Sequence, residues 1–309
     1  MRRILLGVMA LLVWLGAEAA PKTLIYEIKG EDTLRMDFYG VPDKDAPCMV
    51  FMFGGGFFTG QRNKPAYIDF FEEMNRNGIA VASIDYRLGL AEVRNMTTKP
   101  SVGELVGLLT ASVDMAVEDL YSATRYLLAH TTELGISPSK IVPCGSSAGA
   151  ISVLTAEWRR SRGEADLPEG FSYAGVISFA GAVYSTSGAP KWDVDKACPL
   201  MLYHGDADSN VPYRKLAVGK VGMFGTDYLY DKYLSRADAP YYVCIYRDVD
   251  HVVAGAPYLQ NRQQICWFID KIVLGKREFQ VYEQVRDLAY PAKRPPRSIF
   301  DYVKANFGG

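Results

Sequence analysis

The sequence has few of the residues that bind metals, cross-link small folds or hold nucleic acids. Its 309 residues include only three histidines and five cysteines, and 34 Lys+Arg against 35 Asp+Glu give a formal net charge of −1. An odd number of cysteines cannot pair completely within one chain, and no two of them have a zinc-ligand spacing such as Cys-x₂-Cys. A protein that binds nucleic acid needs an excess of basic residues, which is missing here. We therefore expect no metal site from cysteine and no nucleic-acid partner.

Long hydrophobic runs are also scarce, and the one at the N-terminus is too short to cross a bilayer comfortably. Ile4–Leu15 falls short of the roughly 20 apolar residues that a membrane-spanning helix requires. It follows the basic Met1–Arg3 and precedes Gly16–Ala19, which supplies small residues for cleavage, as in a secretory signal peptide. We predict a signal peptide at residues 1–19 and a single domain at residues 20–309. The mature protein is expected in the periplasm or the extracellular space, without stable membrane insertion after cleavage.

The rest of the chain alternates short apolar runs with longer amphipathic stretches, in an ordinary globular composition of 49 % hydrophobic and 22 % charged residues. The runs predict strands at Thr23–Lys29, Thr33–Tyr39, Pro47–Phe53, Gly78–Asp85, Lys140–Cys144, Ala174–Phe179, Pro199–Tyr203 and Tyr241–Tyr246. The stretches predict helices at Tyr67–Asn77, Leu109–Leu134, Ala148–Arg159, Tyr228–Ser235 and Pro257–Leu274. Apolar strands separated by helices indicate an α/β fold, with a mostly parallel central sheet of about eight strands and helices on both faces.

Two segments break this rhythm. Ala91–Glu104 and Arg160–Phe171 are irregular, and we expect both to follow strands that end near the functional site and to wall a substrate pocket. The tail Lys276–Gly309 contains several prolines and is predicted to be a surface extension.

Gly145–Gly149, with the sequence Gly-Ser-Ser-Ala-Gly, is the strongest local signal for chemistry. It matches Gly-x-Ser-x-Gly and lies between the predicted strand Lys140–Cys144 and the helix that starts near Ala148. A sharp strand-to-helix turn strains its central residue, needs small residues two positions before and after it, and holds a hydroxyl at a helix N-terminus. We predict Ser147 as the nucleophile, because the neighbouring Ser146 lacks glycines at the corresponding positions.

A glycine cluster, Phe53–Phe57, ends an apolar strand well upstream of the serine. Glycines allow a backbone to approach a substrate closely, and an oxyanion requires rigid N–H donors about 3 Å away. A flexible loop without function is the alternative interpretation. We predict an oxyanion hole formed by the N–H groups of Gly55, Gly56 and Ala148.

Three histidines are available to serve as the base for a serine hydroxyl. His130 lies in a predicted helix, and we interpret it as a surface or helix-end residue. His204 precedes a glycine at the end of a strand, so we interpret it as a turn residue. His251 follows the strand Tyr241–Tyr246 late in the chain, and we predict it as the base.

The carboxylate that orients the base is expected on a loop between the serine and the histidine. Asp206 and Asp208 both follow a predicted strand in this interval. We assign Asp206 to the tight turn and predict Asp208 as the acid, because Asp208 lies further out and can reach a neighbouring loop. Asp248 and Asp250 are too close to His251 in sequence to orient its ring easily.

Taken together, these motifs resemble the α/β-hydrolase superfamily, in the esterase/lipase branch that carries an HGGG-type oxyanion motif. The resemblance rests on Phe53–Phe57, Asp85–Leu88, Gly145–Gly149, His204–Asp208 with Val211-Pro212, and His251. It spans residues 23–274 and has the Ser…Asp…His order of that fold. Phe53 departs from the His that often begins the family motif, although cholinesterase-like carboxylesterases carry an aromatic residue there. The analogy makes Asp85 and Arg87 scaffold residues.

The resemblance implies a secreted serine esterase that hydrolyses carboxylic esters through an acyl-enzyme, without a metal or an organic cofactor. We expect a small-molecule or carbohydrate ester with a short acyl or small aromatic acyl group. A peptidase of the prolyl-oligopeptidase type shares the triad, but the chain has no room for the propeller domain that such enzymes normally add. A non-catalytic binding protein on the same fold is the other alternative, although no triad member is missing.

Overall fold

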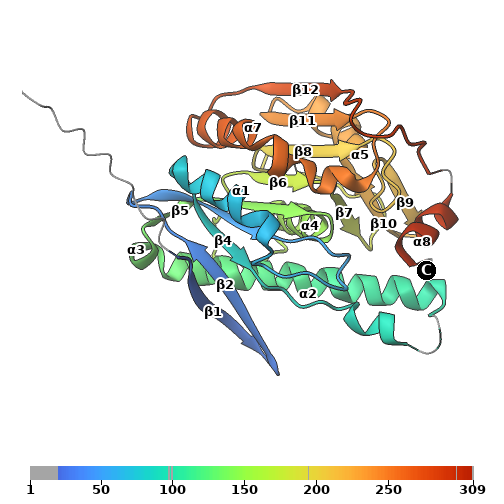
Figure 1. Cartoon of the computed structure of the whole chain (residues 1–309), viewed down its shortest axis with the longest axis horizontal. Coiled ribbons are helices and arrows are strands. Elements are labelled where there is room, and N and C mark those ends of the chain that lie inside the picture. The colour runs from blue at the N-terminus through green and yellow to red at the C-terminus, as the bar shows by residue number, and fades with distance from the viewer. Residues whose placement is uncertain (1–19, 97, 99, 194, 297, 308–309) are drawn as a thin grey trace, which may run out of the picture.

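A nine-stranded sheet forms the centre of the computed structural model, which describes residues 20–307 except 97, 99, 194 and 297 (Figure 1). The predicted signal peptide lies outside the described residues. The strand order is β1-β2-β4-β3-β5-β6-β8-β11-β12. The strands are β1 (Lys22–Lys29), β2 (Asp32–Tyr39), β3 (Ala46–Met52), β4 (Ala80–Ile84), β5 (Ile136–Ser146), β6 (Val176–Phe179), β8 (Leu200–Gly205), β11 (Tyr241–Tyr246) and β12 (Gln280–Val285).

The register of this sheet is mostly parallel. The β1–β2 and β2–β4 pairs are antiparallel, and the remaining pairs are parallel. Strands β3, β4, β8 and β11 are buried along their whole length, as strands covered on both faces must be. The expected mostly parallel sheet is confirmed, with nine strands instead of about eight.

Helices cover both faces of the sheet (Figure 1). The helices are α1 (Pro65–Arg76), α2 (Val102–Ala129), α3 (Thr131–Leu134), α4 (Ala148–Ser161), α5 (Thr226–Lys232), α6 (Ala256–Gln260), α7 (Arg262–Trp267) and α8 (Ile299–Phe307). Short 3₁₀ turns are η1 (Ala91–Asn95), η2 (Leu234–Arg236) and η3 (His251–Ala254), and η4 (Phe268–Leu274) is π-helical. Helix α2 packs against α4, whereas α1 packs against α6 and α7. Within the part of the chain that the structure describes, none of the helices has the length and apolarity to cross a membrane.

Helix α2 begins at Val102 rather than at Leu109. The Ser101 hydroxyl accepts from the N–H of Glu104, and the Glu104 carboxylate accepts from the N–H of Ser101, which is a capping box. The Ser-x-x-Glu signal for this start is in the sequence, but glycines at positions 103 and 107 weaken the helical pattern. The segment Ala91–Glu104 therefore consists largely of η1 and the first turn of α2.

The described residues of the C-terminal tail lie at the surface, as predicted, but they also add a strand to the sheet, which was not predicted. Strand β12 pairs in parallel with β11 and forms one edge of the sheet. Helix α8 then returns toward the carboxyl ends of the strands (Figure 1). A second, three-stranded sheet was also not expected from the sequence. It has the order β7-β10-β9, with β7 (Ala182–Ser185), β9 (Lys215–Val218) and β10 (Val221–Gly225).

The segment Arg160–Phe171 does not wall the serine site, which corrects an expectation from the sequence. It leaves the C-terminus of α4 and enters β6 at its amino end, so it lies at the opposite edge of the sheet. There Gly170 and Phe171 border a different pocket, together with Pro138 at the beginning of β5.

Candidate active site

Ser147 occupies a sharp turn between β5 and α4, with a backbone φ of 52° and ψ of −115°. A positive φ is strained for a residue with a Cβ atom. A Cβ on Gly145 would lie 2.4 Å from the carbonyl carbon of Gly149, and one on Gly149 would lie 2.2 Å from the carbonyl oxygen of Met52. Both positions therefore require glycine, because Gly145 packs against the first turn of α4 and Gly149 packs against the end of β3. Ala148 begins α4, so its N–H has no acceptor within the helix.

Ser147, His251 and Asp208 form one hydrogen-bonded chain. The Ser147 Oγ atom lies 2.7 Å from His251 Nε2, and His251 Nδ1 lies 2.7 Å from Asp208 Oδ2. Because an ionised carboxylate only accepts hydrogen bonds, Nδ1 donates and Nε2 is left to accept the Ser147 hydroxyl. The three residues follow the carboxyl ends of β5, β11 and β8, which meet at one edge of a parallel sheet.

Asp208 is completely buried, and both carboxylate oxygens have donors. Its Oδ1 atom accepts from the backbone N–H groups of Asn210 and Val211, both at 2.8 Å. Burial by itself raises the pKa of the Asp208 carboxyl, but the neighbouring His251 and His204 imidazoles stabilise the ionised form and hold this pKa well below its usual range. The acid is therefore a carboxylate across the neutral pH range.

His204 contacts the predicted acid, so its interpretation as a turn residue is wrong. It is fully buried in β8, and its Nε2 atom lies 3.3 Å from Asp208 Oδ2 and 3.2 Å from the carbonyl oxygen of Val211. Since both neighbours accept, Nε2 carries the hydrogen, and Nδ1 accepts from the Thr226 hydroxyl at 2.9 Å. The imidazole thus has a partner at each ring nitrogen, and its Nε2 atom faces Asp208.

The alternative carboxylates have other partners. Asp206 accepts from the N–H of Asp248 at 2.6 Å and pairs with Arg247 at 2.9 Å, so it joins the loops after β8 and β11. Asp250 caps η3 by accepting from the backbone N–H of His251 at 2.7 Å. Among the described residues, Asp208 is the carboxylate that contacts the His251 ring.

The remaining alternatives lie apart from the hydrogen-bonded chain. The buried Ser146 hydroxyl donates to the carbonyl oxygen of Ala254 at 2.8 Å, which fixes η3 to the end of β5. His130 is the C-terminal cap residue of α2, and its ring stacks on Tyr126. It is a helix-end residue, as interpreted from the sequence.

The glycine loop after β3 runs directly beside the serine. A Cβ on Gly54 would lie 3.2 Å from the Cβ of Ser147, and one on Gly55 would lie 1.8 Å from the carbonyl oxygen of Thr59. Gly55 has φ of 141° and Gly56 has φ of 65°, conformations that other residues rarely adopt. Within the described part of the chain, no hydrogen bond uses the N–H of Gly55 or Gly56, so both donors are available to a substrate.

Phe53 supports this loop from the protein interior. Its ring stacks on Tyr86 with centroids 4.5 Å apart, and the Tyr86 hydroxyl donates to the Phe53 carbonyl oxygen at 2.8 Å. A Cβ on Gly60 would lie 2.4 Å from the Phe53 ring, so the loop folds tightly over it. The aromatic residue therefore occupies the position of the usual His as a buried anchor.

Asp85 and Arg87 have no contact with Ser147. Asp85 pairs with Arg62 at 2.7 Å, and Arg87 Nε lies 3.0 Å from an Asp119 oxygen on α2. These ion pairs connect the ends of the strands to neighbouring elements, as scaffold residues do.

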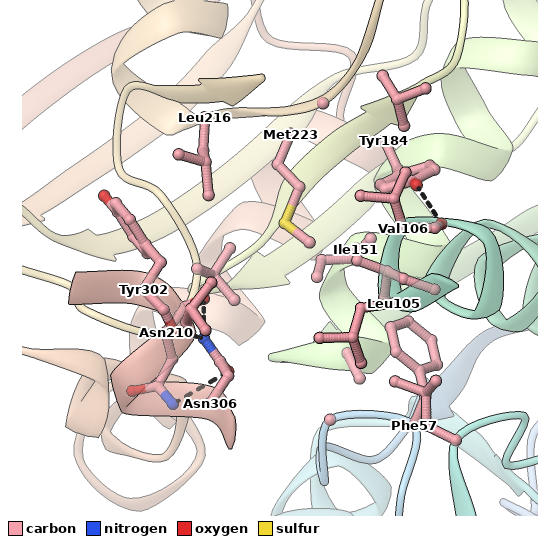
Figure 2. Close-up of a pocket in the computed structure, with 18 of the residues that line it drawn as sticks. Phe57, Leu105, Val106, Ile151, Tyr184, Asn210, Leu216, Met223, Tyr302 and Asn306 are labelled. Atoms are coloured by element: carbon pink, nitrogen blue, oxygen red, sulfur yellow. Dashed lines mark hydrogen bonds between the residues drawn. The ribbon is translucent and has the colours of Figure 1, made fainter. Parts of the chain in front are cut away.

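Ser147 borders an apolar cavity of about 150 Å³ on one side (Figure 2). Its walls come from the glycine loop, α2, α4, the three-stranded sheet and α8. The side chains that define it include Phe57, Leu105, Val106, Ile151, Leu216 and Met223. The segment Ala91–Glu104 contributes to this wall through Val102, as expected for one of the two irregular segments.

On its other side Ser147 borders a larger and more polar pocket of about 680 Å³. Lys64, Gln61, Tyr67 and Tyr258 line this pocket together with His251. Burial raises the pKa of Tyr67 to about 12, so its phenol is neutral at ordinary pH and acts as a hydrogen-bonding group. The serine thus stands between an apolar chamber and a polar one.

The chain has the α/β-hydrolase fold. A mostly parallel sheet covered by helices, with a strained serine on a strand-to-helix turn, is the arrangement of that superfamily. Two solved structures of an esterase from Thermogutta terrifontis have the same fold. Its propionate-bound form has a TM-score of 0.60 at 19 % identity, covering 83 % of this chain and 96 % of that one. Its apo form has a TM-score of 0.58 at 18 % identity, covering 88 % and 100 %.

Sequence comparison narrows the resemblance to esterases. Residues 15–163 match the model of the Carboxylesterase family. Acetylcholinesterase of Bungarus fasciatus is 31 % identical over 126 residues, which is 40 % of this chain and 19 % of that protein. Para-nitrobenzyl esterase of Bacillus subtilis (strain 168) is 25 % identical over 128 residues, which is 40 % of this chain and 24 % of that protein. The matched part of the chain thus spans about a fifth to a quarter of these relatives, and the resemblance to the esterase branch is confirmed.

Two features of the site were missed in the sequence. The contact of His204 with Asp208 joins residues four apart, and the spacing alone does not indicate it. Helix α8 contributes to the apolar cavity from the far end of the chain. The turn that follows Asp208 does have a local signal, because an Asp side chain commonly accepts from backbone N–H groups two and three positions later.

Proposed function

We propose that the protein hydrolyses carboxylic esters through a covalent acyl-enzyme on Ser147. The observation that carries the proposal is the chain of two 2.7 Å hydrogen bonds from Ser147 through His251 to Asp208. It lies beside the N–H donors of the glycine loop, as acyl transfer requires. The esterase relatives and the fold support the same chemistry.

In the proposed mechanism, each group has one role. His251 Nε2 takes the proton of the Ser147 hydroxyl as its oxygen attacks the ester carbonyl, and the same imidazolium then protonates the departing alcohol. Asp208 keeps the His251 ring in the tautomer that makes Nε2 the acceptor. The N–H groups of Gly55, Gly56 and Ala148 stabilise the oxyanion of each tetrahedral intermediate. A water molecule, deprotonated by His251, then attacks the acyl carbon, and His251 returns that proton to the Ser147 oxygen as the acid leaves.

In this proposal, one pocket beside Ser147 binds the acyl half of the ester and the other binds the alcohol half. The apolar cavity of about 150 Å³ suits the acyl group, since a cavity of that size and lining in another protein accepts a benzene-sized molecule. A short acyl chain or a small aromatic acyl group fits this volume. The polar pocket with Lys64 and Gln61 suits a water-soluble alcohol such as a sugar. An esterase with the same fold is described with bound propionate, which is a short acyl group.

The protein is proposed to act outside the cytoplasm. The basis of this proposal is the sequence of residues 1–19, in which a basic start, an apolar run and small residues follow one another. Mass spectrometry of the N-terminus of the exported protein tests it, and a mature chain that begins near Ala20 is the expected result. A protein that stays in the cytoplasmic fraction and still begins with Met1 contradicts the proposal.

The test of the activity is hydrolysis of para-nitrophenyl acetate and butyrate by the wild type and by Ser147→Ala. We expect a loss on the order of 10⁴–10⁶-fold in kcat with an unchanged melting temperature. A fluorophosphonate probe is expected to label the wild type at Ser147. Ser146→Ala serves as the matched control because this variant still has the Ser147 nucleophile. Undiminished hydrolysis by Ser147→Ala, or labelling of a different serine, overturns the proposal.

A further inference from the structure

Helix α8, from the segment expected to be peripheral, closes one side of the apolar cavity. Tyr302, Val303 and Asn306 line the cavity, and their spacing places them on one face of the helix. Phe300, one turn before Val303 on the same helix, is 77 % exposed. The helix therefore has residues that line the cavity and residues that are exposed to solvent.

Two hydrogen bonds fix this helix to the turn that carries the catalytic acid. The Asn210 side-chain amide donates to Asn306 Oδ1 at 3.3 Å, and the Asn306 amide donates to the Asn210 carbonyl oxygen at 3.1 Å (Figure 2). The backbone N–H of Asn210 also donates to Asp208 Oδ1. The position of helix α8 is thus fixed relative to Asp208, and through it relative to His251 and Ser147.

The cavity lies between this helix and the opposite wall. Figure 2 shows Tyr302 and Asn306 on one side of the cavity and Phe57, Leu105 and Val106 on the opposite side. Asn306 also borders the polar pocket, so it stands where the apolar and polar chambers meet. A change in the size of a side chain on this face of α8 changes the room available to an acyl group.

We propose that Tyr302 and Val303 of α8 determine the length of the acyl group that the enzyme accepts, with Asn306 holding the helix in place. The inference rests on the proposed function and deepens it, because it assigns acyl selectivity to the C-terminal helix. The esters concerned are those of short aliphatic or small aromatic acids. The Tyr302 side chain acts as a wall, so its ring matters and its hydroxyl does not.

The test is the ratio of kcat/KM for para-nitrophenyl octanoate to that for para-nitrophenyl butyrate. Truncation in Tyr302→Ala is expected to raise this ratio about tenfold or more, because each methylene that a pocket accepts is worth roughly tenfold or more in kcat/KM. Enlargement in Val303→Trp is expected to lower it by a similar factor. Tyr302→Phe keeps the ring and the wild-type ratio.

Two further variants complete the design. Asn306→Ala removes both hydrogen bonds to Asn210 and is expected to move the ratio in the same direction as Tyr302→Ala. Phe300→Ala, at an exposed position of the same helix, is the matched control and keeps the wild-type ratio.

The outcomes separate this inference from the proposed function. An active wild type whose ratio is unchanged by Tyr302→Ala and by Val303→Trp overturns the inference and leaves ester hydrolysis intact. A wild type that hydrolyses no ester and takes up no fluorophosphonate overturns both. If Tyr302→Ala fails to fold, as judged by circular dichroism, the opposite shift in Val303→Trp still decides.

Discussion

The Nε2 atom of His204 lies 3.3 Å from Oδ2 of Asp208, the same carboxylate oxygen that accepts from His251 Nδ1. A second histidine, remote from the serine, therefore helps to hold the acid. Both oxygens of the buried carboxylate have N–H partners: Oδ1 accepts from two backbone N–H groups, and Oδ2 accepts from His251, with His204 Nε2 3.3 Å away. Full satisfaction of this kind fixes a buried group in one orientation, and here it fixes the direction in which Asp208 meets the base.

His204→Phe is expected to lower kcat by about 10–100-fold, because loss of one donor to a buried charged group costs roughly 1–3 kcal/mol. KM for a short ester should change little, since His204 touches neither substrate chamber. His204→Gln retains an amide N–H near the Nε2 position and is expected to recover part of the loss. An equal loss in both variants, accompanied by a fall in melting temperature, contradicts a positioning role and indicates a packing role.

Asp208→Asn is expected to reduce kcat by about 10⁴-fold, since an amide favours the wrong tautomer of the base, as in a serine protease. Asp206→Asn and Asp250→Asn are matched controls on the neighbouring loops, where each carboxylate holds backbone N–H groups instead of the His251 ring. They should lose at most about tenfold in the same assay. A larger loss in Asp250→Asn than in Asp208→Asn would show that the acid is misassigned.

The depressed pKa of Asp208 makes a prediction for the pH dependence of stability. A carboxyl group whose pKa is lower in the folded than in the unfolded chain stabilises the fold above its unfolded pKa of about 4, and this contribution disappears as the pH falls through the folded value. The difference in the free energy of unfolding between the wild type and Asp208→Asn should therefore narrow as the pH falls from 5 toward 3. Urea titrations at several pH values measure it. A difference that does not vary with pH contradicts the assignment of an ionised, stabilising Asp208.

Much of the fold could be predicted from local patterns. Strand β11 has the predicted bounds Tyr241–Tyr246, because a continuous apolar run in a fully buried strand leaves little ambiguity. Strand β9, by contrast, has only four residues, none fully buried, so its pattern does not separate it from a loop. Helix α8 is short and follows two prolines, and its role depends on contacts with residues some 90 positions earlier, such as Asn210. Local sequence carries no information about such a return of the chain.

The part of the candidate site that lies in local sequence motifs could also be predicted, whereas the part that depends on tertiary packing could not. Ser147 lies in a motif whose glycines are required by close backbone packing, so the motif in the sequence directly predicts the turn. The choice of Asp208 over Asp206 depended on which carboxylate can extend to the loop that carries His251, and sequence position indicates this only roughly. The donors from His204 and the wall from α8 arise from tertiary packing and have no equivalent motif.

Gly55→Ala is expected to lower kcat by about 10²–10³-fold, the usual effect of losing one oxyanion donor. A Cβ at this position would lie 1.8 Å from the carbonyl oxygen of Thr59, and φ of 141° is unfavourable for alanine, so the loop must move. Gly107→Ala is the matched control, because a Cβ there meets nothing within 4 Å and α2 should gain about 0.5–1 kcal/mol in stability. If Gly55→Ala retains full turnover, the glycine loop does not supply the oxyanion hole.

The enzyme is expected to prefer short acyl or small aromatic acyl esters and to lack activation at an oil–water interface. The apolar cavity of about 150 Å³ has little room for a long chain, and the polar pocket of about 680 Å³ already brings Ser147 and His251 to the surface. No element has to open before a soluble ester can reach the serine, because α8 covers the apolar chamber while the polar side remains accessible. A rate profile against acyl length, from acetate to dodecanoate, with methyl ferulate and acetylated xylan in parallel, tests this expectation. Highest kcat/KM for the long-chain esters, with a jump in rate above their micelle concentration, would identify a true lipase and contradict the prediction.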